Sequence, residues 1–356
     1  MNSIVVGGHY GDEGKGKMVS YLALKDDPRI IARAGVGPNA GHTVYKDGKK
    51  YGLRMITCGF VNAKSKLLVG AGVLVDPRRF LDEIELTETR GRAFLDRRCT
   101  VIDERHRKLD ASGNSKKIGT TGSGCGPANA DRVNRVARRA EDFPELKDYL
   151  TDVPLTVNDA IKDGKDVLIE GTQGFGLSVY YGNYPYVTSK DTSASTAAAD
   201  VGIGPTKIDE VYVVYKAYMS RVGEDPYVKY LSDDDVKKSR MWSRILKAAQ
   251  EADSPGQNAN ERIAHFLGEK GTVTGRPRKI ADFDFKLARY SVMVNGATKV
   301  IVTCIDKLFP ECQGIRDYDK LSEAAREYLD KLEEELGVDV SLISTGPDVF
   351  DVVDLR

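Results

Sequence analysis

Short apolar runs recur along the chain, and each is continuous rather than alternating with polar residues. Continuous runs are typical of parallel strands that other layers cover on both faces. Small or acidic residues follow several of them, as at Gly7, Gly70 and Glu170. We predict central strands at five of these runs: Ile4–Val6, Leu67–Val69, Val167–Ile169, Val211–Tyr215 and Val300–Val302.

Segments with helical spacing lie between these runs, for example Phe80–Ile84 and Asp131–Ala140. The stretch Asp319–Leu336 predicts an amphipathic helix, because its apolar residues recur three and four positions apart. Those residues are Leu321, Ala325, Tyr328, Leu332 and Leu336. Strands that alternate with helices predict an α/β fold, here a single large domain with a mainly parallel, doubly wound central sheet and helices on both faces. Ligands bind such sheets at the carboxyl ends of the strands.

Residues 228–270 differ from the rest of the chain, because they are strongly polar and hold the only tryptophan. Trp242, Ile245, Leu246 and Ala249 predict one face of a helix, and the sequence DSPGQNAN after them predicts a loop. We interpret 228–270 as a surface excursion of one domain that spans residues 1–356, with no internal repeat.

The composition is that of an ordinary globular protein and excludes several classes of partner. Lys and Arg together number 53, as do Asp and Glu, so no net charge favours nucleic acid or a membrane surface. The five cysteines are scattered without a C-x-x-C pair, which argues against a zinc site or a disulfide framework and favours a reducing cytoplasm. We see neither a signal peptide nor an apolar run long enough to cross a membrane.

The sequence GGHYGDEGKGK at residues 7–17 combines five glycines, two lysines and an Asp-Glu pair directly after a predicted strand. It is neither a Walker A motif, since Gly16 stands where Ser or Thr is required, nor a G-x-G-x-x-G motif. Glycine amides, a following helix N-terminus and lysines nevertheless suit a phosphate. Asp12 within this loop predicts a Mg²⁺ ligand or a proton acceptor, against the alternative of a tight turn with a salt-bridged Asp.

Three further loops are rich in small residues and suit anions. Residues 33–44 contain Asn39, Gly41 and His42, and histidine can donate to a phosphate oxygen or move a proton. Residues 119–135 form a Gly- and Thr-rich turn that leads into a helix with arginines. Residues 271–279 contain one arginine on each side of a proline. Together with residues 7–17 they predict a phosphate-binding site assembled from several loops.

These stretches together resemble the adenylosuccinate synthetase family, and its compact archaeal-type core most closely. The resemblance covers about residues 4–347 and is weakest over 228–270. It rests on motifs that occur in the family's order: GDEGKGK, NAGHT, TTGSGCGP, EGTQG, YPYVTS, TGRPR and STGPD. It implies a ligase that joins L-aspartate to C6 of a 6-oxopurine nucleoside monophosphate through a 6-phosphoryl intermediate, with Mg²⁺ and with GTP or ATP as the phosphoryl donor.

The resemblance also implies roles for individual residues. Asp12 takes the proton from purine N1 and binds Mg²⁺ together with the Gly41 carbonyl. His42 donates to the transferring phosphoryl group, whose charge Lys15 and the glycine amides spread. The arginine at Arg135 reaches the site of a neighbouring subunit, which implies a homodimer.

The remaining implied contacts fall into three sets. The purine nucleotide meets Asp12, Asn39, Thr121, Arg135, Gln173, Thr188 and Arg276. Aspartate meets Thr272, Val273, Thr274, Gly275 and Arg276. The triphosphate donor meets Gly11, Glu13, Gly14, Lys15, Gly16, Lys17, Gly41, His42, Thr43, Arg278, Cys304, Asp306, Ser344 and Gly346. Asp306 is expected to select guanine, whereas Cys304 stands where many members carry lysine, so ATP stays open beside GTP.

Several positions depart from the family's usual pattern: His9-Tyr10 replaces Gln-Trp, residues 224–230 replace GPFPTE, and Ala281-Asp282 replaces Gly-Trp. A related viral branch acts on dGMP and makes N6-succino-2-amino-2′-deoxyadenylate for 2-aminoadenine DNA. Most of that branch replaces the residue matching Asp12, and intermediate forms keep it. We therefore expect dGMP as the substrate, in a host's cytoplasm if the protein is viral, with IMP as the alternative.

Three other classes of function compete with this prediction. A GTPase switch requires Ser or Thr after the Walker A lysine, and an NAD-dependent dehydrogenase requires G-x-G-x-x-G with an acidic residue about twenty positions later. A non-catalytic nucleotide-binding module would not need Asp12 and His42 together. The sequence motifs favour the ligase over all three.

Overall fold

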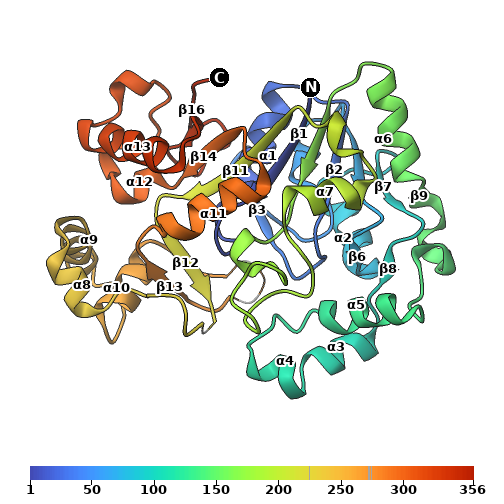
Figure 1. Ribbon diagram of the computed structural model, residues 1–356, viewed down its shortest axis with the longest axis horizontal. Helices are drawn as coiled ribbons and strands as arrows, with labels where there is room; N and C mark the ends of the chain where they lie inside the picture. Colours follow the sequence, from blue (N-terminus) through green and yellow to red (C-terminus); the bar gives the residue numbers. More distant parts are fainter. Residues whose placement is uncertain (224, 272, 274) are drawn as a thin grey trace.

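The central feature of the protein is a ten-stranded sheet, which runs through the molecule in Figure 1. The computed structural model describes residues 1–223, 225–271, 273 and 275–356. Thr272 and Thr274 of the predicted aspartate-binding segment lie outside these residues. Across the described residues, every helix is too short or too polar to cross a lipid bilayer.

The strand order is β16-β15-β14-β11-β1-β10-β2-β5-β7-β9, and all neighbours are parallel except β15 and β16. The strands are β1 (Asn2–Gly7), β2 (Ile30–Arg33), β5 (Lys66–Val69), β7 (Ala93–Asp96), β9 (Leu150–Thr151), β10 (Val167–Glu170), β11 (Glu210–Lys216), β14 (Lys299–Thr303), β15 (Val340–Ser344) and β16 (Val352–Asp354). The predicted doubly wound, mainly parallel sheet is confirmed, and each of the five predicted runs lies in one of its strands.

Helices cover the sheet on both faces, which is why its strands are apolar throughout. Ile4 and Val6 pack into the hydrophobic cluster that contains α6, α7, α11 and α13, whereas Val5 packs into the opposite cluster with α1 and α2. The helices are α1 (Lys15–Lys25), α2 (Pro77–Thr87), α3 (Glu104–Asp110), α4 (Gly113–Lys117), α5 (Cys125–Asn134), α6 (Val153–Lys162), α7 (Ala194–Val201), α8 (Asp233–Lys238), α9 (Arg240–Glu251), α10 (Ala259–Phe266), α11 (Phe285–Asn295), α12 (Ile305–Leu308) and α13 (Glu323–Leu336).

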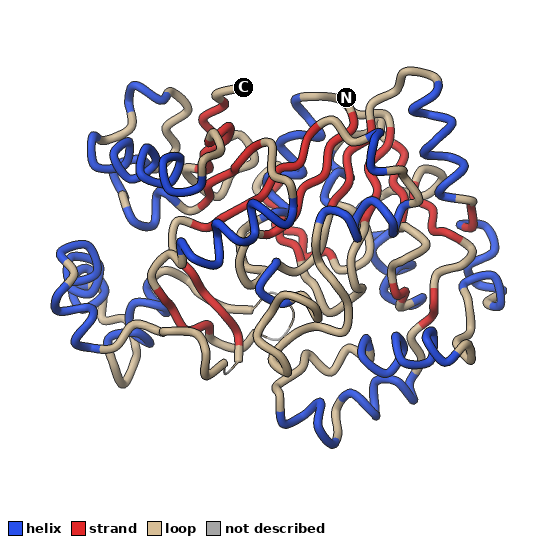
Figure 2. Tube along the Cα trace, viewed as in Figure 1, coloured by secondary structure: helices blue, strands red, loops and turns tan. Residues whose placement is uncertain are grey.

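Among the described residues, three small two-stranded sheets lie outside the central sheet. They pair β3 (His42–Lys46) with β4 (Lys49–Leu53), β6 (Leu74–Val75) with β8 (Thr100–Val101), and β12 (Met219–Val222) with β13 (Arg278–Ala281). Figure 2 shows long loops gathered below the strands of the central sheet, on the side away from the N-terminus. Since β1 starts at the N-terminus, these loops lie at the carboxyl ends of the parallel strands, where ligands are expected.

Two predicted helices have different ends in the structure. The helix predicted over 131–140 ends at Asn134, because Arg135 adopts the left-handed conformation with φ 63° and stops it. The helix predicted over 319–336 begins only at Glu323, because the Ser322 side chain accepts a hydrogen bond from the Ala325 amide and forms the N-cap. Both boundaries depend on local backbone geometry that hydrophobic periodicity does not register.

The segment 228–270 forms α8, α9 and α10, at the lower left of Figure 1. Trp242 on α9 is fully buried, and its ring meets that of Tyr218 edge-on with a centroid separation of 5.8 Å. Its indole nitrogen donates to Asp282 Oδ1 at 2.6 Å. The tryptophan therefore joins this segment to the main hydrophobic cluster, beside β12 and β13.

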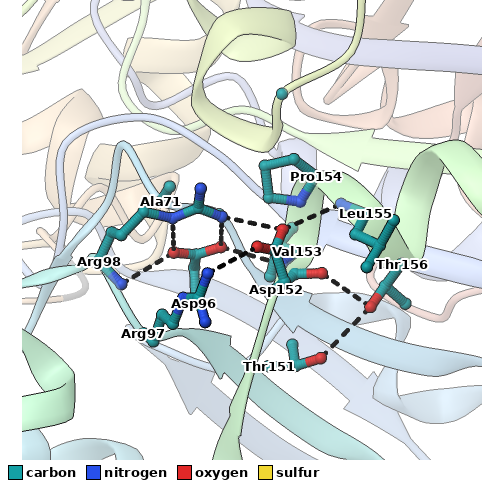
Figure 3. Close-up of polar contacts among 12 residues, drawn as sticks. Ala71, Asp96, Arg97, Arg98, Thr151, Asp152, Val153, Pro154, Leu155 and Thr156 are labelled. Carbon is teal, nitrogen blue, oxygen red and sulfur yellow. Dashed lines mark hydrogen bonds and ion pairs between the residues drawn. The ribbon is translucent and has the colours of Figure 1, made fainter.

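A buried carboxylate joins the end of β7 to the start of α6, as Figure 3 shows. Arg98 donates to Asp96 twice, from Nε to Oδ1 and from Nη2 to Oδ2, each at 2.7 Å. Asp96 Oδ2 also accepts the Val153 amide at 2.9 Å, and Asp152 Oδ1 accepts the Leu155 amide at 3.1 Å as the N-cap of α6. These bonds satisfy amides at the first turn of α6 that have no partner within the helix.

Candidate functional site

One cleft of about 390 Å³ opens among the loops at the carboxyl ends of β1, β2 and β10. It brings together residues that are far apart in the sequence. Of the predicted site residues, those that line it are Gly11, Asp12, Asn39, Gly41, His42, Thr121, Gln173, Thr188, Val273, Arg276 and Arg278. The loops that the sequence singled out therefore meet at one place.

The glycine-rich loop after β1 is held in shape by Glu13. Its Oε1 accepts the amides of His9 at 3.0 Å and Gly11 at 2.7 Å, and its Oε2 pairs with Lys15 Nζ at 2.7 Å. A Cβ on Gly8 would overlap the ring of Tyr215, so this position requires glycine. Glu13 and Lys15 are buried and lie outside the cleft lining, so their geometry supports the loop itself. The predicted contact of Lys15 with the phosphoryl group stays a prediction.

Asp12 faces the cleft and pairs with an arginine from another loop. Its Oδ1 lies 2.8 Å from Arg278 Nη2, and the two side chains are only 18% and 14% exposed. Burial raises the pKa of Asp12 to about 6, although the positive charges of Arg278 and Lys216 oppose this effect. A carboxyl with that pKa can exchange a proton near neutral pH.

His42 is the second ionisable group of the cleft, and a buried carboxylate orients it. Its Nδ1 hydrogen-bonds Glu170, and among the described residues its Nε2 has no hydrogen-bond partner. Burial lowers the pKa of His42, against the opposing effect of Glu170. Because Glu170 fixes the ring through Nδ1, the buried Nε2 is the nitrogen left to serve a ligand.

Glu170 was not singled out as a site residue by the sequence, although it is the acidic residue directly after a predicted strand. Its Oε2 accepts the Cys58 amide at 2.7 Å, and its Oε1 lies 3.3 Å from Arg33 Nη1. Burial acts to raise the pKa of Glu170, but hydrogen bonding and the charges of His42 and Arg33 hold it below its usual value. The carboxylate therefore stays ionised beside the imidazole.

Three amide and hydroxyl side chains form a chain along another wall of the cleft. Gln173 Nε2 donates to Asn39 Oδ1 at 2.8 Å, and Asn39 Nδ2 donates to Thr188 Oγ1 at 3.2 Å. Arg276 Nη2 donates to the carbonyls of Gly119 at 3.1 Å and Thr120 at 3.3 Å, and so joins the loop before α5 to the cleft. Thr121, which was predicted to meet the purine nucleotide, lies on that loop and lines the cleft.

A second group of predicted residues gathers outside the cleft lining, around Lys17. Its Nζ donates to Ser344 Oγ at 2.7 Å and to the Gly346 carbonyl at 2.6 Å. Burial lowers the pKa of Lys17 to about 8, while the charges of Asp351, Cys304 and Asp306 oppose this. Lys17, Ser344 and Gly346, predicted to meet the triphosphate donor, are thus adjacent to one another.

Other predicted residues lie apart from the cleft. Arg135 is exposed at the end of α5. Gly16 at the start of α1 has a packing role, since a Cβ there would come within 2.9 Å of both Cys58 Sγ and His42 Cβ. Five further predicted residues are absent from the cleft lining: Gly14, Thr43, Gly275, Cys304 and Asp306.

The donor set of the cleft suits a magnesium ion. Asp12 and Gly41 both line it and would supply a carboxylate and a carbonyl, and Mg²⁺ prefers hard oxygen ligands completed by water and phosphate oxygens. A bound Mg²⁺ would neutralise negative charge on a transferring phosphoryl group. The residues present therefore fit the predicted ion.

Comparison with known proteins identifies relatives over the whole chain. The model of the adenylosuccinate synthetase family matches residues 4–147 and 143–311. Adenylosuccinate synthetase of Methanosphaera stadtmanae is 52% identical over 359 residues, which cover 99% of this chain and 98% of that protein. The protein of the same name from Archaeoglobus fulgidus is 53% identical over 356 residues, with 99% and 98% covered.

Two solved structures share the fold. Fully ligated adenylosuccinate synthetase from Plasmodium falciparum superimposes with a TM-score of 0.84 at 22% identity, over 99% of each chain. Succinoaminodeoxyadenylate synthetase of cyanophage S-2L, bound to dGMP and to dATP as an energy donor, superimposes with a TM-score of 0.75 at 24% identity, over 100% of this chain and 95% of that one. At these identities the likeness establishes the common fold.

Proposed function

This chain belongs to the adenylosuccinate synthetase family, and from that premise we propose that it joins L-aspartate to C6 of IMP. As a member of the family it is a carbon–nitrogen ligase that uses Mg²⁺ and GTP. The observation that carries the choice of IMP is the identity of 52% and 53% to archaeal adenylosuccinate synthetases over 99% of the chain. Adenylosuccinate is the product expected from aspartate and IMP.

The chemistry requires that the C6 oxygen, a poor leaving group, be phosphorylated before an amine replaces it. In the proposed first step Asp12 takes the proton from purine N1, and O6 attacks the γ-phosphorus of the triphosphate, from which a nucleoside diphosphate departs. In the second step the aspartate amine attacks C6, loses a proton, and phosphate leaves with the oxygen. The raised pKa of Asp12 supports its role as the proton acceptor.

His42 is proposed to stabilise the phosphoryl group during transfer. Its Nε2 has no partner among the described residues and can donate to a phosphoryl oxygen once the ring is protonated. Glu170 on Nδ1 and the negative charge of the phosphoryl group favour that form and oppose the effect of burial. We further propose that Asn39, Gln173 and Thr188 bind the purine nucleotide, that the loop carrying Arg276 binds aspartate, and that Lys17, Ser344 and Asp306 bind the donor. These assignments extend the family's roles to matching positions.

A second candidate substrate is dGMP, because two of the departures from the family pattern, Tyr10 and Asp225, both contact Arg221, which lines the cleft. The Arg221 guanidinium carbon lies 4.8 Å from the centroid of the Tyr10 ring, and the Tyr10 hydroxyl accepts from Asn183 Nδ2 at 3.4 Å. Asp225 Oδ2 in turn accepts from Asn183 Nδ2 at 3.2 Å and pairs with Arg221 Nη1 at 3.0 Å. Departures from the family pattern that contact a lining arginine support a changed nucleotide preference.

Parallel assays of phosphate release separate the candidates. The purified protein is given aspartate, Mg²⁺ and either GTP or ATP, with IMP, GMP or dGMP in turn, and the product is identified by mass. We expect at least about tenfold higher kcat/KM for IMP than for dGMP, which requires a transition-state difference of about 1.4 kcal/mol. Turnover on dGMP without IMP would favour the second candidate, and phosphate release that needs neither aspartate nor purine would indicate a GTPase.

The variant Asp12→Asn tests the proposed base in the same assay. Asparagine cannot accept the N1 proton, so kcat should fall about 100-fold or more. Asp47→Asn, in the exposed turn between β3 and β4, is the control and should leave kcat unchanged. A fully active Asp12→Asn enzyme would refute the proposed proton transfer.

The proposed enzyme is a homodimer in which each Arg135 reaches the neighbouring cleft. Arg135 is exposed at the end of α5, between Val133 and Val136, which are 75% and 68% exposed. Apolar side chains with that exposure beside an arginine are suited to an interface. We place the enzyme in the cytoplasm, which agrees with five unpaired cysteine thiols, four of them buried.

A further inference from the structure

Behind Asp12 lies a buried ionic cluster that the proposed mechanism does not use. The Glu269 cluster consists of Lys216, Tyr218, Glu269 and Arg278. Glu269 Oε1 accepts from Lys216 Nζ at 2.5 Å and from the Tyr218 hydroxyl, and Glu269 Oε2 accepts from Arg278 Nη1 at 3.0 Å. Lys216 Nζ also donates to Ser220 Oγ at 2.8 Å. Both oxygens of the carboxylate are therefore occupied by donors.

Burying such a cluster is costly, because each charge leaves water. Glu269 and Lys216 are each 5% exposed, and replacing a buried ion pair by apolar residues is often neutral or stabilising. Hydrogen bonds that satisfy both oxygens make the arrangement stable in one geometry only. A cluster of fixed geometry can hold one of its side chains in a fixed position. Arg278 is the residue of the Glu269 cluster that lines the cleft.

Arg278 is held by Glu269 through two separate bonds. The Arg278 amide donates to the Glu269 carbonyl at 3.2 Å, so these residues close the base of the loop between them. The two terminal nitrogens of the guanidinium contact different carboxylates: Nη1 lies 3.0 Å from Glu269 Oε2, and Nη2 lies 2.8 Å from Asp12 Oδ1. Lys216 is the last residue of β11, and Tyr218 follows shortly after it. The two residues that hold Glu269 therefore come from a part of the chain distant in sequence from Glu269 and Arg278.

We propose that Glu269 is a positioning residue that fixes the Arg278 guanidinium for phosphoryl transfer. Nη1 keeps its bond to Glu269 throughout, while Nη2 leaves Asp12 for an oxygen of the incoming phosphoryl group. The same exchange releases the Asp12 carboxylate for the purine. The inference rests on the proposed function, since it needs a phosphoryl group to reach Arg278. It assigns a role to Glu269, Lys216 and Tyr218 that the sequence motifs did not indicate.

A double-mutant cycle tests whether Glu269 acts through Arg278. Glu269→Gln should lower kcat about 100-fold, because a misplaced catalytic group costs that much, while KM for the purine nucleotide changes less than about twofold. Arg278→Met should lower kcat at least as far. If Glu269 acts only through Arg278, the double variant is no slower than Arg278→Met alone. Losses that multiply would overturn the proposal.

Chemical rescue distinguishes positioning from a purely structural role of Glu269, because a structural role predicts no dependence of rescue on Glu269. Guanidinium chloride at millimolar concentration should restore part of the kcat of Arg278→Ala, because Glu269 still binds a guanidinium in the vacated position. It should restore none in Arg278→Ala/Glu269→Gln. Equal rescue of both variants would overturn the proposal.

Two further variants separate positioning from folding. Tyr218→Phe removes one hydrogen bond to Glu269 and keeps every charge, so it should lower kcat about two- to fivefold, with a loss of Tm no larger than that of Glu83→Gln. Glu83→Gln alters another buried glutamate, one that accepts the Arg54, Met55 and Ile56 amides, and should lower Tm but not kcat. A parent enzyme inactive on every purine would defeat the proposed function, whereas an active parent with additive losses would defeat this inference alone.

Discussion

At the scale of single residues, the cleft and the glycine-rich loop beside it depend on pairs in which one side chain orients another. Glu170 orients His42, Glu13 holds Lys15 and the amides of the glycine-rich loop, and Glu269 holds Arg278. In each pair the carboxylate is buried and its partner is a cation or an ionisable ring. In two of these pairs, His42 with Glu170 and Arg278 with Glu269, the carboxylate was not among the site residues predicted from the sequence.

The pair of His42 and Glu170 yields a direct prediction. Glu170→Gln removes the negative charge that stabilises the protonated ring, so we expect kcat to fall about 100-fold, the typical contribution of a proton donor, with KM nearly unchanged. Steady-state kinetics with a Tm measurement check this. Cys58→Ser is the control, because it keeps the main-chain amide that donates to Glu170, and it should retain kcat within about twofold. Parental kcat in Glu170→Gln would contradict the role given to His42.

In the pairs of His42 with Glu170 and Arg278 with Glu269, the sequence revealed the predicted site residue and not its carboxylate partner. Asp12 and His42 stand in loops of unusual composition, and this composition was the signal. Glu170 is separated from His42 by 128 positions, and Lys216 from Glu269 by 53. Contacts over such separations leave no periodicity or spacing in one sequence, so the contact of Glu170 with His42 and that of Lys216 with Glu269 were found only in the structure.

At the scale of elements, junctions between strands and helices depend on buried carboxylates, and Asp96 is an example that can be tested. It is fully buried and receives hydrogen bonds from Arg98 and the Val153 amide. Asp96→Asn should lower the free energy of unfolding by about 2 kcal/mol at pH 7, the usual cost of disrupting hydrogen bonds to a buried charged group. Urea unfolding measures this value. Asp159→Asn on the exposed side of α6 should change it by less than about 0.5 kcal/mol.

The same carboxylate predicts a pH dependence of stability. Burial acts to raise the pKa of Asp96, but the hydrogen bonds from Arg98 and the backbone hold it below its usual value. Because the folded-state pKa is the lower one, ionised Asp96 stabilises the fold above about pH 4, the unfolded value, and this contribution disappears as pH falls through the folded pKa. The difference between parent and Asp96→Asn should therefore shrink below about pH 4. A difference that stays constant to pH 3 would contradict this account.

Element boundaries show a similar division between pattern and geometry. The existence of α13 and its buried face were predicted, and Leu321, Ala325, Leu332 and Leu336 are all buried. Its first turn was misplaced, because Ser322 caps the helix after a short turn over 318–320. Hydrophobic periodicity reports which face is buried, whereas caps and left-handed residues decide where a helix starts and stops.

At the scale of the whole molecule, the proposed homodimer makes the two clefts interdependent, and mixed variants test this. Asp12→Asn and Arg135→Ala should each be nearly inactive alone. If Arg135 of one subunit completes the cleft of its partner, a mixed dimer contains one intact cleft, and equal mixing should restore about a quarter of the parental activity. Activity is measured after subunit exchange, with size-exclusion chromatography to verify the dimer. Absence of restoration despite mixed dimers would show that each cleft is complete in itself.

What the sequence determined by itself was the class of fold and the loops that meet at the cleft. Continuous apolar runs predicted a covered parallel sheet, because such strands leave no polar face, and the composition of the loops at 7–17 and 33–44 located Asp12 and His42. Only the tertiary structure decided the order of the ten strands, the partners of each ionisable group and the burial that raises the pKa of Asp12 to about 6. The physical reason is that desolvation and ion pairing depend on which distant segments pack together, and local residue order does not specify this.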